Sequence, residues 1–200
     1  MIMPDATSTM ASAPTVAVLD ACVLYPPSLR DLLMWLATVL IYEPRLSEEI
    51  HAEWTRNVLS DNSAVTPAQL DRTRKLMNQV TPNCLVSGYE RRIPSLSLPD
   101  EGDRHVLAAA IEAGASVIVT YNLSDFPNIV LCGYGIQALH PDVFLSALFD
   151  HEAELFLRGV QAHRASLKNP PKTAQDYLAT LRATGLQSLA LRLEAFLLLI

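Results

Sequence analysis

Two short apolar runs, each ending abruptly in polar residues, constrain the fold of this chain most strongly. Residues 16–19 (VAVL) end at Asp20, and residues 117–119 (VIV) lead into a polar turn at 121–127. A continuous apolar run of this length is typical of a strand buried on both faces of a parallel sheet. Helical patterns stand between and after these runs. Strands that alternate with helices predict an α/β fold with a mostly parallel sheet.

Helical spacing and end signals place the intervening elements. Leucines recur at helical spacing over residues 29–40, and residues 42–46 could form another short strand. Ser47 is a predicted N-cap for a helix to about residue 59, with Glu48 and Glu49 in its first turn, where the helix dipole favours anions. Further helices are predicted over about 67–80, 103–113 and 141–149, a strand over 136–139, and loop with a short strand over 83–99.

Three segments of different character divide the 200 residues. Residues 1–14 are rich in Ser, Thr, Ala and Met and carry no basic residue, so a disordered leader is predicted rather than a signal peptide. Residues 15–149 carry the α/β pattern. Residues 150–200 show amphipathic helical stretches through residue 167, over 173–181 and from 186 to the end, with the clearest break at Asn169-Pro170-Pro171, and they predict an added helical hairpin.

Composition excludes several classes of protein. The longest nearly uninterrupted apolar run, residues 32–42, is shorter than the roughly 18 to 20 residues that a membrane helix needs, so no transmembrane helix is expected. Cys22, Cys84 and Cys132 form no C-x-x-C pair, so neither a disulfide framework nor a thiolate zinc site is indicated. The net charge of −6 argues against binding nucleic acid through a broad basic surface. Any such binding must be local.

Carboxylates lie where this kind of fold builds its sites. Ligands of parallel sheets bind outside the carboxyl ends of the strands, where Asp20 and Asp125 are expected. Asp103 opens one predicted helix, and Glu53 lies one turn after Glu49 on another. Clustered Asp and Glu with few His or Cys are the ligands of Mg²⁺ or Mn²⁺ rather than zinc. Such an ion would lower the pKa of a bound water for attack on a phosphodiester.

Each acid also has a purely structural interpretation. Asp100 and Asp103 could only cap a helix, an effect of about 1 kcal/mol. Glu53 could lie on a solvated helix face, and Asp125 could cap a turn. Asp20 is the hardest to explain in this way, because an acid that ends a buried strand is costly unless something compensates its charge.

Four separated segments match one known family in order. They are VLDACVL at residues 18–24, SEEIHAE at 47–53, LPDEGDRHVLAAA at 98–110 and VTYNLSDFP at 119–127. Over residues 16–143 they resemble the PIN-domain family, and in particular the bacterial VapC-like toxins and their uncharacterised relatives. The resemblance implies a three-layer α/β domain with a mostly parallel central sheet, here followed by a C-terminal helical extension.

The resemblance also implies which residues form the site. The catalytic and metal-binding carboxylates would be Asp20, Glu53, Asp103 and Asp125, with Asp100 as a fifth metal ligand. Thr120 and Asn122 would orient a carboxylate or a water. If one of these assignments is wrong, we expect it to be Glu53, with Glu49 as the ligand in its place. Weak candidates for contact with RNA are the basic residues Arg104, Arg56, Arg91 and Arg92.

The implied activity is cleavage of single-stranded RNA by an endoribonuclease that depends on Mg²⁺ or Mn²⁺ and leaves a 5′-phosphate and a 3′-hydroxyl. Many relatives are held inactive by an antitoxin protein. We therefore expect a cytoplasmic toxin with RNA and an antitoxin as partners, no membrane association, and a homodimer as an option. The main alternative is a PIN-fold binding or scaffold module without catalysis, which retention of all four acids disfavours.

Two other hydrolase classes fit less well. A phosphatase of the haloacid-dehalogenase kind carries a second Asp two residues after the first, and here that position is Cys22. We interpret Cys22 as a small buried residue near the site rather than a nucleophile. The five histidines show no H-E-x-x-H or comparable zinc spacing.

Overall fold

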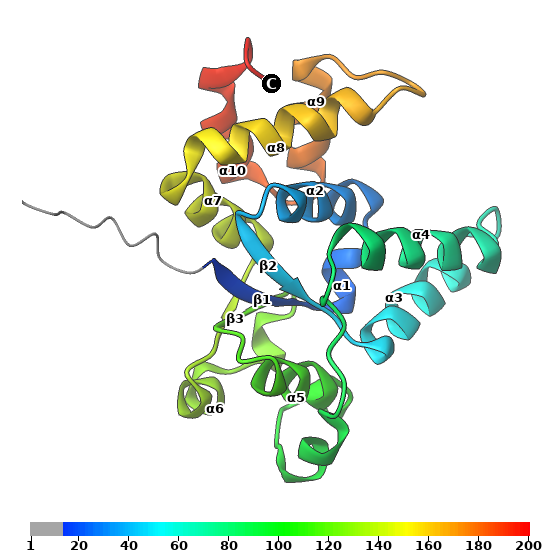
Figure 1. The fold of residues 1–200 in the computed structure, drawn as a ribbon, viewed down its shortest axis with the longest axis vertical. Coiled ribbons are helices and arrows are strands. Elements are labelled where there is room, and N and C mark those ends of the chain that lie inside the picture. Colours follow the sequence, from blue (N-terminus) through cyan, green and yellow to red (C-terminus); the bar gives the residue numbers. More distant parts are fainter. Residues whose placement is uncertain (1–13) are drawn as a thin grey trace, which may run out of the picture.

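The computed structural model describes residues 14–200, in which a four-stranded, all-parallel sheet lies between layers of helices (Figure 1). The sheet order is β2-β1-β3-β4, with β1 (Thr15–Leu19), β2 (Tyr42–Arg45), β3 (Val117–Val119) and β4 (Gln137–Leu139). The predicted α/β class and parallel sheet are confirmed. Except for Pro14, the predicted leader lies outside the described residues.

Helices connect the strands and cover both faces of the sheet. In the first half of the chain they are α1 (Ala21–Leu24), α2 (Pro27–Thr38), α3 (Glu48–Asp61) and α4 (Pro67–Val80). Between β2 and β4 follow the 3-10 turns η1 (Glu90–Ser95) and η2 (Glu101–Asp103), α5 (Arg104–Glu112), η3 (Leu123–Asp125), α6 (Asn128–Leu131) and η4 (Cys132–Tyr134). Helix α5 lies on one face of the sheet and α2 on the other (Figure 1).

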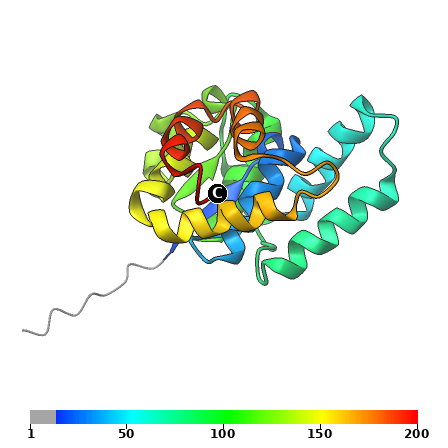
Figure 2. The same ribbon diagram turned by 90° about the horizontal axis from the view of Figure 1, so that it is seen from above.

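Sequence signals at the helix ends explain the projecting pair α3 and α4. The Ser47 hydroxyl accepts a hydrogen bond from the backbone N–H of Ile50, as expected for an N-cap. Thr66 and Gln69 form a reciprocal capping box, and Pro67 is the first residue of α4. The two helices pack side by side and extend away from the sheet (Figure 2). Helix α3 starts directly after β2, so its first two turns, which carry Glu49 and Glu53, lie close to the sheet.

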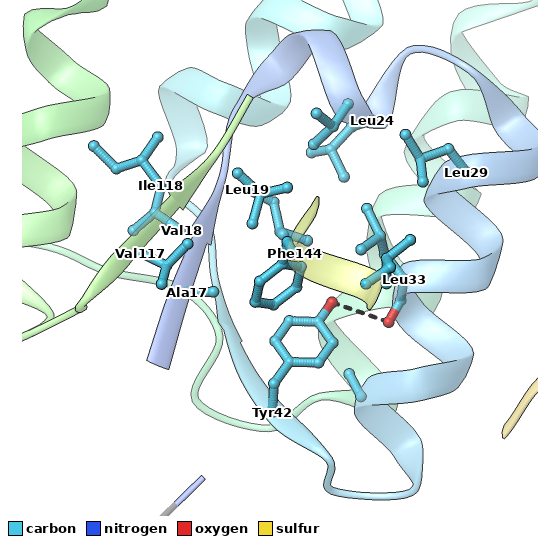
Figure 3. Close-up of a cluster of buried hydrophobic side chains, with 14 of the residues drawn as sticks. Ala17, Val18, Leu19, Leu24, Leu29, Leu33, Tyr42, Val117, Ile118 and Phe144 are labelled. Atoms are coloured by element: carbon cyan, nitrogen blue, oxygen red, sulfur yellow. Dashed lines mark hydrogen bonds between the residues drawn. The ribbon is translucent and has the colours of Figure 1, made fainter. Parts of the chain in front are cut away.

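The core fixes the positions at which the strands end. Ala17, Val18 and Leu19 of β1 and Ile118 of β3 are fully buried; Leu19 lies on the side of the sheet that faces Leu29 and Leu33 of α2, and Ile118 lies on the opposite side (Figure 3). The Tyr42 hydroxyl donates to the Leu33 carbonyl at 3.0 Å, which ties β2 to α2. Burial of this apolar surface is the main favourable contribution to folding. The residues that follow β1 and β3 therefore start from rigid elements.

The C-terminal segment is helical at all three stretches predicted from the sequence, which is one helix more than a simple hairpin. It comprises α7 (Pro141–His151), α8 (Ala153–Ser166), α9 (Ala174–Ala183), α10 (Gln187–Leu193) and the turn η5 (Glu194–Phe196). Helix α8 packs on α2, and α10 packs on α7 and α9 (Figures 1 and 2). A third helix forms because Gly185, at φ +83°, ends the α9 turn and lets α10 start in a new direction. The domain boundary expected between residues 149 and 150 stays a prediction.

One predicted strand is shorter than expected. Within residues 83–99, only Leu85 pairs with the sheet, through a single bridge to Leu46. The chain then turns into η1, which contains Pro94, a residue without the N–H that a strand ladder needs. Among residues 14–200, no helix has the length and apolar character needed to cross a membrane.

Candidate functional site

Asp20 is a buried carboxylate held in one orientation at the end of β1. Its side chain is 2% exposed, and Oδ1 accepts from the backbone N–H of Ala21 at 2.6 Å. Oδ2 accepts from the Thr120 hydroxyl at 2.7 Å and from the Cys22 thiol at 3.1 Å. Burial raises the pKa of Asp20, and the hydrogen bonds from Thr120 and Cys22 act in the opposite direction. The carboxylate is therefore tied to two strand ends, and none of the ion pairs among residues 14–200 involves it.

Asp103 stands among the other predicted acids. Burial, together with the charges of Asp20, Asp100, Asp125 and Glu53, raises its pKa to about 7. Carboxylates from four separate chain segments thus lie close enough to repel one another. This arrangement is unfavourable in the protein alone, and a divalent cation would reverse it.

The two aspartates at the start of α5 have different roles in the local structure. The Asp100 side chain accepts from the Gly102 N–H at 2.7 Å and so caps the 3-10 turn. The Asp103 side chain makes no cap hydrogen bond within residues 14–200. The cap interpretation therefore accounts for Asp100, and it leaves the partly buried Asp103 carboxylate unexplained.

Glu53 and Glu49 both reach one buried histidine of α5. His105 is 5% exposed, and its Nε2 lies 3.3 Å from Glu53 Oε2 while its Nδ1 lies 3.9 Å from Glu49 Oε2. Burial lowers the pKa of His105, but the hydrogen bond that its ring donates to Glu53 and the nearby carboxylates outweigh burial and raise it. The ring thus connects the acidic face of α3 to the start of α5.

His105 is the residue that the sequence interpretation missed. The signal that could have found it is its place two residues after Asp103, together with two acids one helical turn apart on α3. His51, which lies between those acids in sequence, points away and contacts Asn78 and Trp54.

Asp125 lies in the turn η3, several residues beyond β3. It is half-buried, and its Oδ1 accepts from the Ser124 hydroxyl at 3.3 Å. The Asn122 backbone N–H donates to the Thr120 hydroxyl oxygen at 2.9 Å, so the loop folds back on the residue that orients Asp20. Phe126 is buried in the core, as expected.

An open cavity of about 350 Å³ lies between α3 and the start of α5. Its lining is polar and consists of Glu49, Glu53, Arg56, Asn57, Asp100, Gly102, Asp103 and His105. Three of the four arginines proposed for RNA contact are engaged elsewhere: Arg104 pairs with Glu101, and Arg91 and Arg92 pair with Glu112. Arg56 is exposed and faces the cavity.

The donor set fits a hard divalent cation by its chemistry. Carboxylate oxygens are the ligands that Mg²⁺ and Mn²⁺ prefer, and nearby negative charge favours an ion with two positive charges. Within residues 14–200, however, no three His, Cys, Asp or Glu side chains converge closely enough to hold a metal ion as they stand. Mutual repulsion opposes a closer approach of these carboxylates in the protein alone.

Comparison with known proteins identifies two matching family models. A PIN-domain model matches residues 15–124, and a model described as the VapC50 C-terminal domain matches residues 141–195. The second match begins at the first residue of α7, before the boundary expected from the sequence. No solved structure matches the chain.

A curated protein of Mycobacterium tuberculosis (strain ATCC 25618 / H37Rv), named "Putative ribonuclease VapC50", is 43% identical over 79 residues. The match covers 40% of this chain and 47% of that protein, so it spans about half the length of the curated relative. The PIN-domain model covers more than half of the chain, includes both strands that end in the acidic site, and agrees with the parallel sheet. The chain therefore belongs to the PIN-domain family.

Proposed function

We propose that this protein is a metal-dependent endoribonuclease that cleaves single-stranded RNA, and that it is the toxin of a toxin–antitoxin pair. One observation carries the proposal: carboxylates from α3 and from the start of α5 face one cavity, beside the buried strand-end carboxylate of Asp20. Membership of the PIN-domain family and the ribonuclease name of the partly matching relative add support.

The proposed metal ligands are the five acids Asp20, Glu53, Asp103, Asp125 and Asp100. When bound, Mg²⁺ or Mn²⁺ would lower the pKa of a water ligand and offset the negative charge of a phosphodiester. This chemistry also explains how a chain with a net charge of −6 can act on RNA, because its acids bind the cation rather than the phosphate.

Residues around these acids would position the reacting groups. The hydroxyl of Thr120 and the thiol of Cys22 hold Asp20, and His105 holds Glu53. Arg56 is placed to contact a phosphate that enters the cavity. In the hydrolysis, the water oxygen bonds to phosphorus, the bond from phosphorus to the 3′-oxygen breaks, and that oxygen takes up a proton. The products are a 5′-phosphate and a 3′-hydroxyl.

The test is cleavage of a mixed single-stranded RNA pool by the wild type and by Asp20→Asn, each with Mg²⁺, Mn²⁺ or EDTA. We expect cleavage by the wild type with either metal, and none with EDTA or with the variant. Cleavage that survives both the chelator and the substitution would contradict a metal-dependent nuclease. A folded wild type that cleaves no RNA under any condition would favour the alternative, a PIN-fold binding module.

The toxin assignment has a separate test. Induced expression should slow the growth of a bacterial host, and co-expression of the protein encoded by the neighbouring reading frame should restore growth. An active enzyme whose expression leaves growth unchanged would remove the toxin assignment and leave the nuclease assignment in place. Cytoplasmic location, the antitoxin partner and a homodimer remain predictions.

A further inference from the structure

One tyrosine of the loop after β3 joins the candidate site to the C-terminal helices. The Tyr121 hydroxyl donates to the Thr184 carbonyl at 2.6 Å, in the turn between α9 and α10. Its ring packs edge-on against His140, with 5.1 Å between ring centroids. Burial raises the pKa of Tyr121 to about 12, so the hydroxyl stays protonated at neutral pH and remains a donor. Gly185 lies against the same ring, because a Cβ built there would be 3.6 Å from Tyr121 Cε1.

The turn that receives this hydrogen bond is itself fixed. The carboxylate of Asp142, at the start of α7, accepts from the backbone N–H groups of Ser188 and Leu189, each at 2.9 Å. These are the first turn of α10, where N–H groups lack partners within the helix. The Thr184 carbonyl therefore belongs to a structure anchored on α7, not to a loose terminus.

From Tyr121 the connection continues to the buried acid of the site. The Tyr121 backbone N–H donates to Cys22 Sγ at 3.2 Å, and the Cys22 thiol donates to Asp20 Oδ2 at 3.1 Å. The residue before it, Thr120, donates to the same Asp20 oxygen at 2.7 Å. Both donors that orient Oδ2 of Asp20 are thus held by the backbone of residues 120 and 121.

We propose that Tyr121 is a positioning residue, through which the C-terminal helices hold the loop that orients Asp20. This inference rests on the proposed function for its effect on catalysis, but the contact itself can be tested without RNA. It assigns to residues 153–200 a role in the geometry of the site.

The test uses the Tyr121→Phe variant, which keeps the ring and removes only the hydroxyl. Tyr134→Phe is the matched control, because Tyr134 is an exposed tyrosine on η4. The readout is the alkylation rate of each cysteine by iodoacetamide in the folded full chain, measured by peptide mass spectrometry. Cys22 reports the loop, while the exposed Cys132 and the buried Cys84 are internal references.

Loss of one neutral hydrogen bond corresponds to about 1 kcal/mol, so we expect alkylation of Cys22 to rise about fivefold in Tyr121→Phe. Cys132 and Cys84 should react at wild-type rates, and Tyr134→Phe should match the wild type throughout. An unchanged Cys22 rate would overturn the proposal. So would equal acceleration at all three cysteines, since the hydroxyl would then stabilise the whole chain and not the loop.

Kinetics with RNA add a second readout. If the wild type cleaves RNA, Tyr121→Phe should lower kcat with KM unchanged, because the variant alters the orientation of Asp20 and not the RNA-binding surface. An unchanged kcat would overturn the catalytic part of the proposal. If the wild type cleaves no RNA, the proposed function fails, and the alkylation of Cys22 still decides whether Tyr121 holds the loop.

Discussion

Two aspartates in different parts of the molecule have opposite electrostatic environments. Asp142, where α7 meets the C-terminal helices, is buried, and each of its two oxygens accepts a backbone N–H from the start of α10. Asp103, at the start of α5, makes no cap hydrogen bond within residues 14–200, and it faces four other carboxylates. The first charge is satisfied by the protein alone. The second is not, and its neighbours increase the cost of its ionisation.

The difference separates an acid that the fold explains from one for which we propose a function. A buried charge with matched donors stabilises the fold, and its removal leaves the N–H groups without partners. A charge crowded by others of the same sign destabilises the protein alone, and a bound cation would offset that cost. Substitutions at the two positions should therefore have opposite consequences for activity and for stability.

The largest expected effect is on catalysis by Asp103→Asn. Loss of a metal ligand should lower the cleavage rate by more than about 100-fold, since even residues that only orient ligands contribute about 10- to 100-fold. The free energy of unfolding should stay the same or rise, because the amide relieves repulsion among the acids. Single-turnover cleavage and urea unfolding measure the two quantities. A variant that keeps wild-type activity would show that Asp103 is not a ligand.

Asp142→Asn should show the reverse pattern. The amide can still accept one hydrogen bond, but its NH₂ group faces the second backbone N–H, so we expect a loss of about 2 kcal/mol in the free energy of unfolding. The cleavage rate of the folded fraction should fall far less than in Asp103→Asn. If the variant is as stable as the wild type, the claim that Asp142 stabilises the fold is wrong.

The two regions should also respond oppositely to acid. His163 of α8 is 2% exposed, and burial together with nearby Lys172 lowers its pKa from 6.5 to about 4. The unfolded chain therefore binds a proton between about pH 6.5 and pH 4 that the folded chain does not. Because of His163, the free energy of unfolding should fall by about 2 kcal/mol when the pH is lowered from 7 to 5.

Asp103 acts in the other direction over the same range. Its pKa is raised from 3.8 to about 7, so the folded chain binds a proton below pH 7 that the unfolded chain does not bind until about pH 4. Protonation of Asp103 thus offsets part of the destabilisation by His163. Urea unfolding at pH 7 and pH 5 should show a steeper loss of stability in Asp103→Asn than in the wild type. Equal slopes would mean that the Asp103 pKa is ordinary.

The smallest effect concerns His105, which lies between Glu53 and Glu49. His105→Ala should lower the cleavage rate by about tenfold, because Glu53 loses the group that orients it. His105→Gln should keep most of the activity, since its side-chain amide can donate to Glu53. The steady-state cleavage rates of the two folded variants, compared with that of the wild type, test this prediction. If both variants lose activity equally, the ring contributes by packing and not through its hydrogen bond.

Most of the fold could be predicted from the sequence because its signals are local. The apolar runs specify β1 and β3, and Ser47 and Thr66 specify the starts of α3 and α4 by the hydrogen bonds that they accept. The helical stretches after residue 150 could be predicted in the same way, but their arrangement could not. That arrangement depends on the turn at Gly185 and on the packing of α10 against α7, which joins residues far apart in sequence.

The site was predictable in part for the same reason. Asp20 and Asp103 could be placed by strand-end and helix-start position, whereas Glu53 rested on the family motif. The position of His105 two residues after Asp103 is a local signal, but it does not indicate that the ring would contact both Glu49 and Glu53. No local pattern indicates that Tyr121 would reach Thr184. Those contacts arise from tertiary packing between α3 and α5, and between the site loop and the C-terminal helices.

The central claim is that the acids around Asp103 form a divalent-cation site, and calorimetric titration with Mn²⁺ tests it most directly. The wild type and Asp142→Asn, both kept at a temperature where they are folded, should bind Mn²⁺ with similar affinity. Asp103→Asn should bind it at least about tenfold more weakly, a loss of about 1.4 kcal/mol. Equal affinity in all three proteins, or no binding by the wild type, would contradict the claim.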